Sequence, residues 1–254
     1  YLDNGSEKVL PGAALVGAGC GSYELITLKG LSEIRRAEVI VYDDLIDEHL
    51  LEFAPESCEL IYAGKRSGRH SKAQEEINEL LAAKALEGKY VVRLKGGDPY
   101  VFGRGGEEAL ALKAHGIPVH EVPGVTSSIG LCGMAGIPVT HRGASRGFHV
   151  ITGHTADNLP PEIEEIRWKS YAKLDETFVF LMGLKSIDMI TEKLMRYGKP
   201  SDTPVAVIHG ENTDGTYVKL VGTLSDIAGK VKEVDFPSPA IIVVGEVAAL
   251  ELTD

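Results

Sequence analysis

The stretch Arg93–Glu108 holds the densest group of residues suited to binding a ligand, and it reads RLKGGDPYVFGRGGEE. An apolar run ends there in the pair Gly96 and Gly97, which is followed by Asp98 and a proline. Glycines let a ligand approach the backbone closely, and a carboxylate accepts hydrogen bonds from hydroxyl or amino groups. Ligands of open α/β sheets bind at the carboxyl ends of strands. We therefore interpret the stretch as a ligand-binding loop; the alternative is that Asp98 merely caps a turn.

Basic side chains gather in a second stretch, Gly64–Lys72 (GKRSGRHSK), which also follows an apolar run. Arginine and lysine bind carboxylates and phosphates through charge-assisted hydrogen bonds. His141 and Arg142 add two further basic groups behind the small hydroxyl residues of Pro123–Ser128, which are suited to line an adenosine pocket. These groups indicate a clamp for an anionic ligand, with a solvated basic loop as the alternative.

A glycine-rich turn, Gly17–Gly21, follows the first apolar run. Position 22 is a serine, so the G-x-G-x-x-G fingerprint of dinucleotide binding is incomplete, and no Lys-Ser/Thr pair makes it a P-loop. Asp43 and Asp44 follow the next apolar run, where an acid is suited to accept a proton or to cap a helix. Spacing alone does not choose between those two roles. No motif of a serine hydrolase or a metal enzyme is present, and we expect no metal.

Short β-rich runs alternate with helical patterns, which is typical of an α/β fold. Helices are predicted at Lys72–Leu86, with Ser71 as its N-cap, and at Ser186–Tyr197, which ends at a glycine and a proline. We expect an N-terminal α/β domain over residues 9–122 and a C-terminal α/β domain over residues 123–250. The predicted strands are Ala13–Gly17, Val39–Tyr42, Glu59–Tyr62, Tyr90–Leu94, Pro118–Val122, His149–Thr152, Thr177–Leu181, Val205–His209, Tyr217–Val221 and Ile241–Val244.

The 254 residues carry a formal net charge of −11 that is unevenly spread. Residues 61–150 hold 12 Lys and Arg against 8 Asp and Glu, whereas the rest of the chain holds 14 against 29. An acidic chain with a basic middle third favours a small polyanion over nucleic acid. No apolar run approaches the roughly 20 residues that cross a bilayer. Three widely spaced cysteines are typical of a reducing compartment, so we expect a cytoplasmic protein. From the charge distribution and the short apolar runs, we expect it to bind neither nucleic acid nor membrane.

Taken in their order along the chain, these motifs resemble those of the uroporphyrinogen-III C-methyltransferases, a branch of the tetrapyrrole methylases. The resemblance covers about Ala14 to Val247. Its most specific parts are Gly64–His70, Gln74–Asn78, Arg93–Glu108, Val122–Ser127, Gly136–Arg142 and Thr152–His154.

The resemblance implies two α/β domains with a ligand cleft between them, working as a homodimer. It further implies that S-adenosylmethionine donates methyl groups to carbons 2 and 7 of uroporphyrinogen III. The products would be precorrin-1, then precorrin-2, with S-adenosylhomocysteine released. Precorrin-2 leads to sirohaem and cobalamin.

By the same resemblance, Asp43 is the proton acceptor and Lys65 the proton donor. The substrate carries eight carboxylates, and we expect the basic groups Arg66, Arg69, Arg104, His141 and Arg142 to hold them. The residues implied in cofactor binding are Gly19, Cys20, Gly96, Gly97, Asp98, Val101, Thr126, Ser127, Met182, Ala206 and Thr213.

The first loop departs from the family pattern, because Cys20, Ser22 and Tyr23 stand where the family usually has Pro, Asp and Pro. Two other functions therefore stay open. One is a later precorrin methyltransferase of cobalamin synthesis, and the other is a non-catalytic homologue that binds tetrapyrrole or cofactor.

Overall fold

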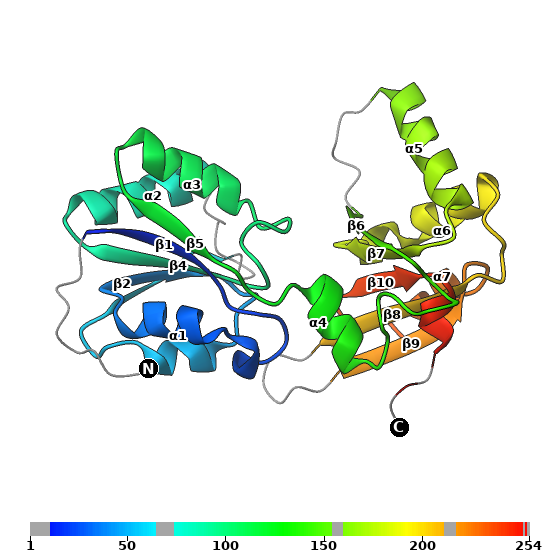
Figure 1. Ribbon diagram of the computed structural model, residues 1–254, viewed down its shortest axis with the longest axis horizontal. Helices are drawn as coiled ribbons and strands as arrows, with labels where there is room; N and C mark the ends of the chain where they lie inside the picture. Colours follow the sequence, from blue (N-terminus) through cyan, green and yellow to red (C-terminus); the bar gives the residue numbers. More distant parts are fainter. Residues whose placement is uncertain (1–10, 65–73, 154–159, 211–216, 251, 253–254) are drawn as a thin grey trace. The chain divides into compact units, whose positions relative to one another are not determined.

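The computed structural model describes residues 11–64, 74–153, 160–210, 217–250 and 252. The described residues fall into two units, one up to Thr126 and the other from Ser127 onward. Each unit has its own sheet flanked by helices (Figure 1). The expected boundary between residues 122 and 123 lies four residues before this division.

The first unit is built on a parallel sheet of five strands in the order β3-β2-β4-β1-β5. Its strands are β1 (Gly12–Gly17), β2 (Val39–Tyr42), β3 (Glu59–Tyr62), β4 (Tyr90–Lys95) and β5 (Val119–Val122). Its helices are α1 (Leu28–Arg35), α2 (Gln74–Leu86) and α3 (Gly105–Ala114), with 3-10 turns at Tyr23–Leu25 and Glu48–Phe53.

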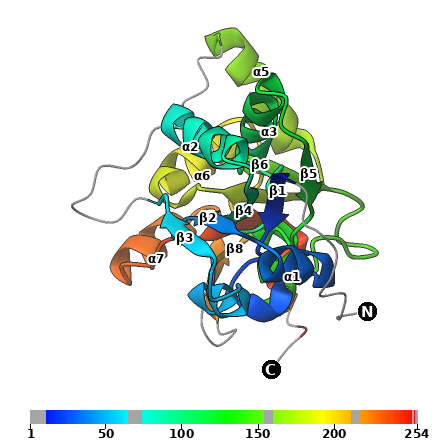
Figure 2. The same ribbon diagram turned by 90° about the vertical axis from the view of Figure 1, so that its left-hand side faces the viewer.

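The first sheet is covered on both faces, which is why β1 and β4 are buried along their whole length. Side chains alternate between the two faces of a strand. On β4, Val91 faces the core under α2 and α3, whereas Tyr90, Val92 and Leu94 face the core under α1. Figure 2 shows α2 and α3 on one side of this sheet and α1 on the other.

The second unit is built on a mixed sheet in the order β6-β7-β10-β8-β9, in which the pair β6–β7 is parallel and the other pairs are antiparallel. Its strands are β6 (Phe148–Thr152), β7 (Thr177–Leu181), β8 (Pro204–Gly210), β9 (Tyr217–Thr223) and β10 (Ile241–Val244). Its helices are α4 (Ser127–Met134), α5 (Pro161–Lys173), α6 (Ile187–Arg196) and α7 (Ile227–Glu233), with 3-10 turns at Leu184–Ser186 and Glu246–Ala249.

An aromatic core fills one face of the second sheet. Trp168 of α5 stacks on Phe180, and Phe178 stacks on the other side chain of this pair, Phe180. Apolar residues of α6 and α7 belong to the same core. Helix α4 contacts β7, β8 and β10. In the part of the chain that is described, no helix has both the length and the apolar character needed to cross a membrane.

The predicted α/β architecture is confirmed, and every predicted strand is present with ends that differ by at most two residues. The helix predicted over 72–86 is described from Gln74, and its expected N-cap, Ser71, lies outside the described residues. The helix predicted over 186–197 spans Ile187–Arg196.

Three glycines hold the carboxyl ends of β1, β4 and β5 in backbone contact. A Cβ atom on Gly124 would lie 2.1 Å from the carbonyl oxygen of Gly97 and 2.7 Å from the Cα atom of Gly17. Such separations are far inside van der Waals contact, and the obstacles are backbone atoms that have no rotamer to change. The loops that follow these strands therefore pack more closely than any side chain would permit.

We predict that Gly124→Ala lowers the free energy of unfolding by about 2–3 kcal/mol, because the added methyl group forces the loops apart. Gly106→Ala is the matched control, since Gly106 lies in α3 and its Cβ would meet nothing within 4 Å. Alanine there is expected to stabilise by about 0.5–1 kcal/mol. Urea unfolding measures both changes, and a Gly124→Ala protein as stable as the wild type would contradict the packing described.

Candidate active site

The carboxyl edge of the first sheet collects several sequence-predicted site residues, because all five strands run in the same direction. The loops after β1 and β4 join through a backbone bridge, in which the Gly19 N–H donates to Gly97 O (3.2 Å) and the Gly97 N–H to Gly19 O (2.7 Å). Asp98 links the next pair of loops: its Oδ1 accepts from Tyr100 N (2.8 Å) and its Oδ2 from Gly124 N (3.2 Å). Asp98 thus caps a turn and also ties the β4 loop to the β5 loop.

Asp43 lies directly after β2, and both of its carboxylate oxygens are held. Oδ1 accepts from the backbone N–H of Leu45 (3.1 Å), and Oδ2 accepts from Nη2 of Arg93 (2.8 Å). The Asp43 side chain is 22% exposed, so the carboxylate is fixed but open to solvent. Such an arrangement suits a group that must meet a ligand in one orientation.

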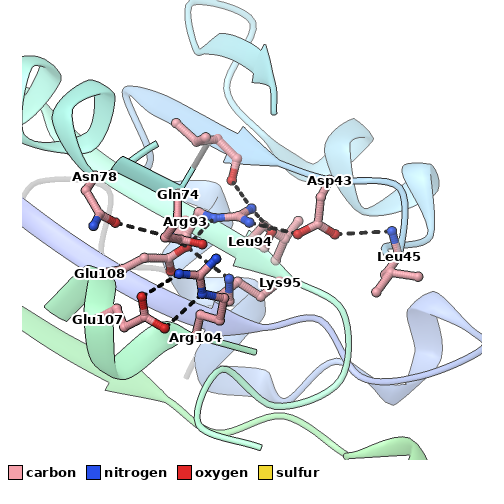
Figure 3. Close-up of polar contacts among 11 residues, drawn as sticks. Asp43, Leu45, Gln74, Asn78, Arg93, Leu94, Lys95, Arg104, Glu107 and Glu108 are labelled. Carbon is pink, nitrogen blue, oxygen red and sulfur yellow. Dashed lines mark hydrogen bonds and ion pairs between the residues drawn. The ribbon is translucent and has the colours of Figure 1, made fainter. Parts of the chain in front are cut away.

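Arg93 is a buried charge at the centre of this edge, with a side chain only 4% exposed. Besides Asp43, its guanidinium donates to Val41 O (3.2 Å), Leu94 O (2.9 Å) and Oε1 of Glu108 (3.2 Å). Figure 3 shows Arg93 between Asp43 on one side and Glu108 on the other. Every nitrogen of the guanidinium therefore has an acceptor, which is the condition for burying an arginine.

Glu108 of α3 is completely buried and supplies the opposing charge. Its Oε1 accepts from Arg93, from Nζ of Lys95 (3.0 Å) and from Nε2 of Gln74 on α2 (3.2 Å). Its Oε2 has no hydrogen-bond partner among the described residues. Burial lowers the pKa of Lys95, and the nearby Arg93 charge acts in the same direction, whereas Glu108 opposes the shift. We call Asp43, Arg93, Lys95 and Glu108 the buried charge cluster.

Arg104 lies outside this cluster on an exposed turn, with 53% of its side chain accessible. It forms a two-pronged ion pair with Glu107, through Nε (2.8 Å) and Nη2 (2.6 Å). An anionic ligand would have to compete with that carboxylate for the guanidinium. The other basic residues expected in this unit, Lys65, Arg66 and Arg69, lie outside the described residues.

The second unit carries the remaining predicted residues that are described. Ser127 begins α4 directly after Thr126, and His141 and Arg142 are exposed in a turn closed by the His141–Ser145 bridge. Met182 follows β7 and is 44% exposed.

The other two residues predicted to bind the cofactor are Ala206 and Thr213. Ala206 is fully buried in β8, paired with Val243 of β10, so its role at the adenine stays a prediction. Thr213 lies outside the described residues.

Backbone strain gathers in the same loops. Among the described residues, the non-glycine positions with positive φ are Phe102, Arg104, Met182 and Asp235, and the first three lie in predicted site motifs. Left-handed backbone is costly for residues with a side chain and tends to persist at functional sites. Half-buried Val101 completes the turn that Asp98 begins, since its N–H donates to Asp98 O (3.2 Å).

The departures in the first loop have local structural roles. The Ser22 hydroxyl caps the 3-10 turn by accepting from Glu24 N (3.2 Å), a role that aspartate also performs. The Tyr23 N–H donates to Oδ2 of Asp47 (2.9 Å), a hydrogen bond that proline lacks the donor to make. Cys20 is buried beside the Gly19 bridge.

Sequence reasoning assigned no role to Arg93, Lys95, Glu108 or Gln74, although it singled out the stretch that contains three of them. A usable signal was present. Arg93 and Lys95 alternate on a strand flanked by apolar residues, so both project from one face of a covered sheet. Buried cations require acidic partners, and Glu108 is near in sequence.

Together, the parallel sheet, the mixed sheet and the charged, glycine-rich carboxyl edge define a two-domain α/β protein with an enzyme-like site. The chain belongs to the family Tetrapyrrole (Corrin/Porphyrin) Methylases, whose sequence profile matches residues 14–228.

The resemblance to uroporphyrinogen-III C-methyltransferases is confirmed by curated relatives. The chain is 51% identical to the enzyme of that name from Methanocaldococcus jannaschii, over 92% of this chain and 95% of the relative. It is 50% identical to an S-adenosyl-L-methionine-dependent uroporphyrinogen III methyltransferase from Methanosarcina barkeri, over 93% and 91%. It also matches siroheme synthases, for example 44% identity with that of Actinobacillus pleuropneumoniae, but spans only about half of their length (49%).

Solved structures agree with the fold. The uroporphyrin-III C-methyltransferase of Thermus thermophilus in complex with S-adenosylhomocysteine is similar with a TM-score of 0.77 and 38% identity, covering 93% of this chain and 98% of that one. A cobalt precorrin-4 methyltransferase has a TM-score of 0.80 and 25% identity, with 94% and 96% covered.

We predict that Glu108→Gln lowers the free energy of unfolding by about 3 kcal/mol, because it leaves two buried cations with one carboxylate. Glu107→Gln is the matched control on the same helix, since Glu107 is exposed and pairs only at the surface. That change is expected to cost less than about 1 kcal/mol. Chemical denaturation of both variants measures these changes in the free energy of unfolding. Equal changes in the two variants would contradict the burial of Glu108.

Proposed function

We propose that this chain is an S-adenosylmethionine-dependent methyltransferase that methylates uroporphyrinogen III at carbons 2 and 7. The product is precorrin-2, formed through precorrin-1. The observation that carries the proposal is the identity of 50–51% to two enzymes named for this reaction, over nearly the whole of each chain. The held but accessible carboxylate of Asp43 supports it from the structural side.

Asp43 has the geometry of a general base in this reaction. The β-carbon of a pyrrole is an enamine-like nucleophile, so correct alignment supplies much of the rate. The new carbon–carbon bond uses a π-electron pair of the pyrrole, and the electron pair of the broken S–CH3 bond stays on sulfur. The methylated macrocycle then loses a proton, which Asp43 accepts. Lys65, the proposed proton donor, lies outside the described residues.

The cofactor, S-adenosylmethionine, supplies an activated methyl group. The glycine-rich loop after β4 fits such a ligand, because Gly96 and Gly97 are only half-buried and carry no side chain. In the first unit, we assign binding to the loops at Gly19–Cys20, Gly96–Val101 and Thr126, where the bridge and Asp98 hold the backbone in place. In the second unit, we assign it to Ser127, Met182 and Ala206. The bound S-adenosylhomocysteine of the Thermus relative supports this cofactor.

The basic residues would bind the carboxylates of the tetrapyrrole. We assign Arg104, His141 and Arg142 to this role from exposed positions, and Arg66 and Arg69 from outside the described residues. Charge supports the assignment, because residues 61–150 are net basic in a chain whose net charge is −11. Arg104 would exchange its Glu107 partner for a substrate carboxylate.

We further propose that the chain acts in the cytoplasm as a homodimer, which light scattering would test. Its product would serve sirohaem or cobalamin synthesis. The second candidate is a later precorrin methyltransferase, which the TM-score of 0.80 with the cobalt precorrin-4 enzyme supports. Sequence identity is lower there, at 25% against 50–51%, so uroporphyrinogen III is the favoured substrate.

We predict that the wild-type protein, incubated anaerobically with S-adenosylmethionine and uroporphyrinogen III, adds two methyl groups to the tetrapyrrole. Mass spectrometry of the product measures the gain, and the release of S-adenosylhomocysteine provides an independent count. Two methyl groups are expected because precorrin-1 is itself a substrate of the proposed reaction.

Calorimetric titration with S-adenosylmethionine is the control for this experiment. Cofactor binding without any methyl gain would contradict the proposed substrate and favour a later precorrin or a non-catalytic binder. Absence of both binding and methylation would overturn the proposed activity as a whole.

A further inference from the structure

The register between β2 and β4 brings Arg93 to Asp43. Arg93 is the register partner of Val41, which stands two residues before Asp43. The guanidinium therefore donates to Val41 O within β2 and also reaches past the end of this strand, where it donates to Oδ2 of Asp43. This contact joins two strands that are neighbours in the sheet but 50 residues apart in the sequence.

The guanidinium is held rigidly, whereas Asp43 alone is not. Arg93 is tied to two backbone carbonyls and to Glu108, and its side chain is 4% exposed. Without Arg93, the hydrogen bonds of the Asp43 carboxylate within the described residues would reduce to one, from the backbone N–H of the exposed Leu45. A loop carboxylate with a single backbone partner samples several rotamers.

Lys95 offers an internal comparison within the buried charge cluster. It lies on the same face of β4, is buried like Arg93 and uses the same oxygen of Glu108. Its ammonium group donates a hydrogen bond to Glu108 and forms none with Asp43. The cluster thus contains one cation that hydrogen-bonds to Asp43 and one that acts on Asp43 only through its charge.

We propose that Arg93 is a positioning residue that fixes the Asp43 carboxylate for proton removal, with Glu108 as the counter-charge that keeps Arg93 in place. The inference rests on the proposed function, in which Asp43 accepts the proton. Arg93 itself, enclosed under α2 and α3, acts on the reaction through Asp43.

Amide hydrogen exchange of Leu45 tests the positioning without any need for activity. In Arg93→Gln, Asp43 is free to rotate away, so the Leu45 N–H is expected to exchange about tenfold faster than in the wild type. In Lys95→Met its rate should match the wild type. Exchange that accelerates equally in the amides of β1 would overturn the proposal, because Arg93 would then be a general support of the fold.

Steady-state kinetics test the consequence for catalysis. Arg93→Gln is expected to lower kcat by about 10–100-fold while KM for S-adenosylmethionine stays within about twofold, because general-base chemistry depends on orientation. Arg93→Lys keeps a cation and should recover part of kcat, and it also carries the test if Arg93→Gln fails to fold. Lys95→Met removes a charge that acts on Asp43 without a hydrogen bond, so its loss of kcat is expected to be at least about fivefold smaller than that of Arg93→Gln.

The outcomes separate the two proposals. A wild-type protein that does not methylate would contradict the proposed function, while Leu45 exchange would still decide whether Arg93 holds Asp43. Unchanged kcat in Arg93→Gln, or an equal loss in Lys95→Met, would overturn the positioning role.

Discussion

The burial of Arg93 is the constraint on which the carboxyl edge of the first sheet depends. A guanidinium under two helices loses its water, and only a full set of acceptors compensates for that loss. The acceptors come from separate parts of the unit: carbonyls of β2 and β4, Asp43 after β2, and Glu108 from α3. Gln74 of α2 joins through Glu108. The Arg93 side chain thereby links two strands, a loop and two helices through direct or shared hydrogen bonds.

Close backbone packing complements this charge network on the other side of β4. Gly17, Gly97 and Gly124 let three loops meet, and Asp98 fastens two of them through its two oxygens. The strained residues Phe102 and Arg104 follow in the same loop. The edge therefore combines rigid support with costly local conformations, as expected where a fold is shaped for a ligand and not for stability alone.

Much of this architecture follows from local sequence patterns. Strands such as Val39–Tyr42 and Ile241–Val244 match their predicted bounds because they are short apolar runs rich in β-branched residues. Strand ends shifted where edge pairing extends a ladder past the apolar run, as in β9. Asp43 and Asp98 were predicted as site residues because each follows an apolar run, and the structure places both acids at the carboxyl edge of a parallel sheet.

The charge cluster was missed for a physical reason. Its contact with Asp43 joins residues that are 50 apart in the sequence, and only the register of β2 on β4 shows that Arg93 reaches Asp43. In the sequence, Arg93 and Lys95 are simply two more basic residues of a basic stretch. Glu108 is buried, whereas its neighbour Glu107 is exposed. This difference depends on which face α3 turns toward the sheet.

We propose that an oriented Asp43 carboxylate removes the proton after methyl transfer. A single-turnover assay of Asp43→Asn with labelled S-adenosylmethionine and uroporphyrinogen III tests it most directly. Asparagine keeps the size and one acceptor oxygen but is not a base. We predict wild-type cofactor affinity with a product-formation rate lower by about 100-fold or more. A rate equal to that of the wild type would contradict the account.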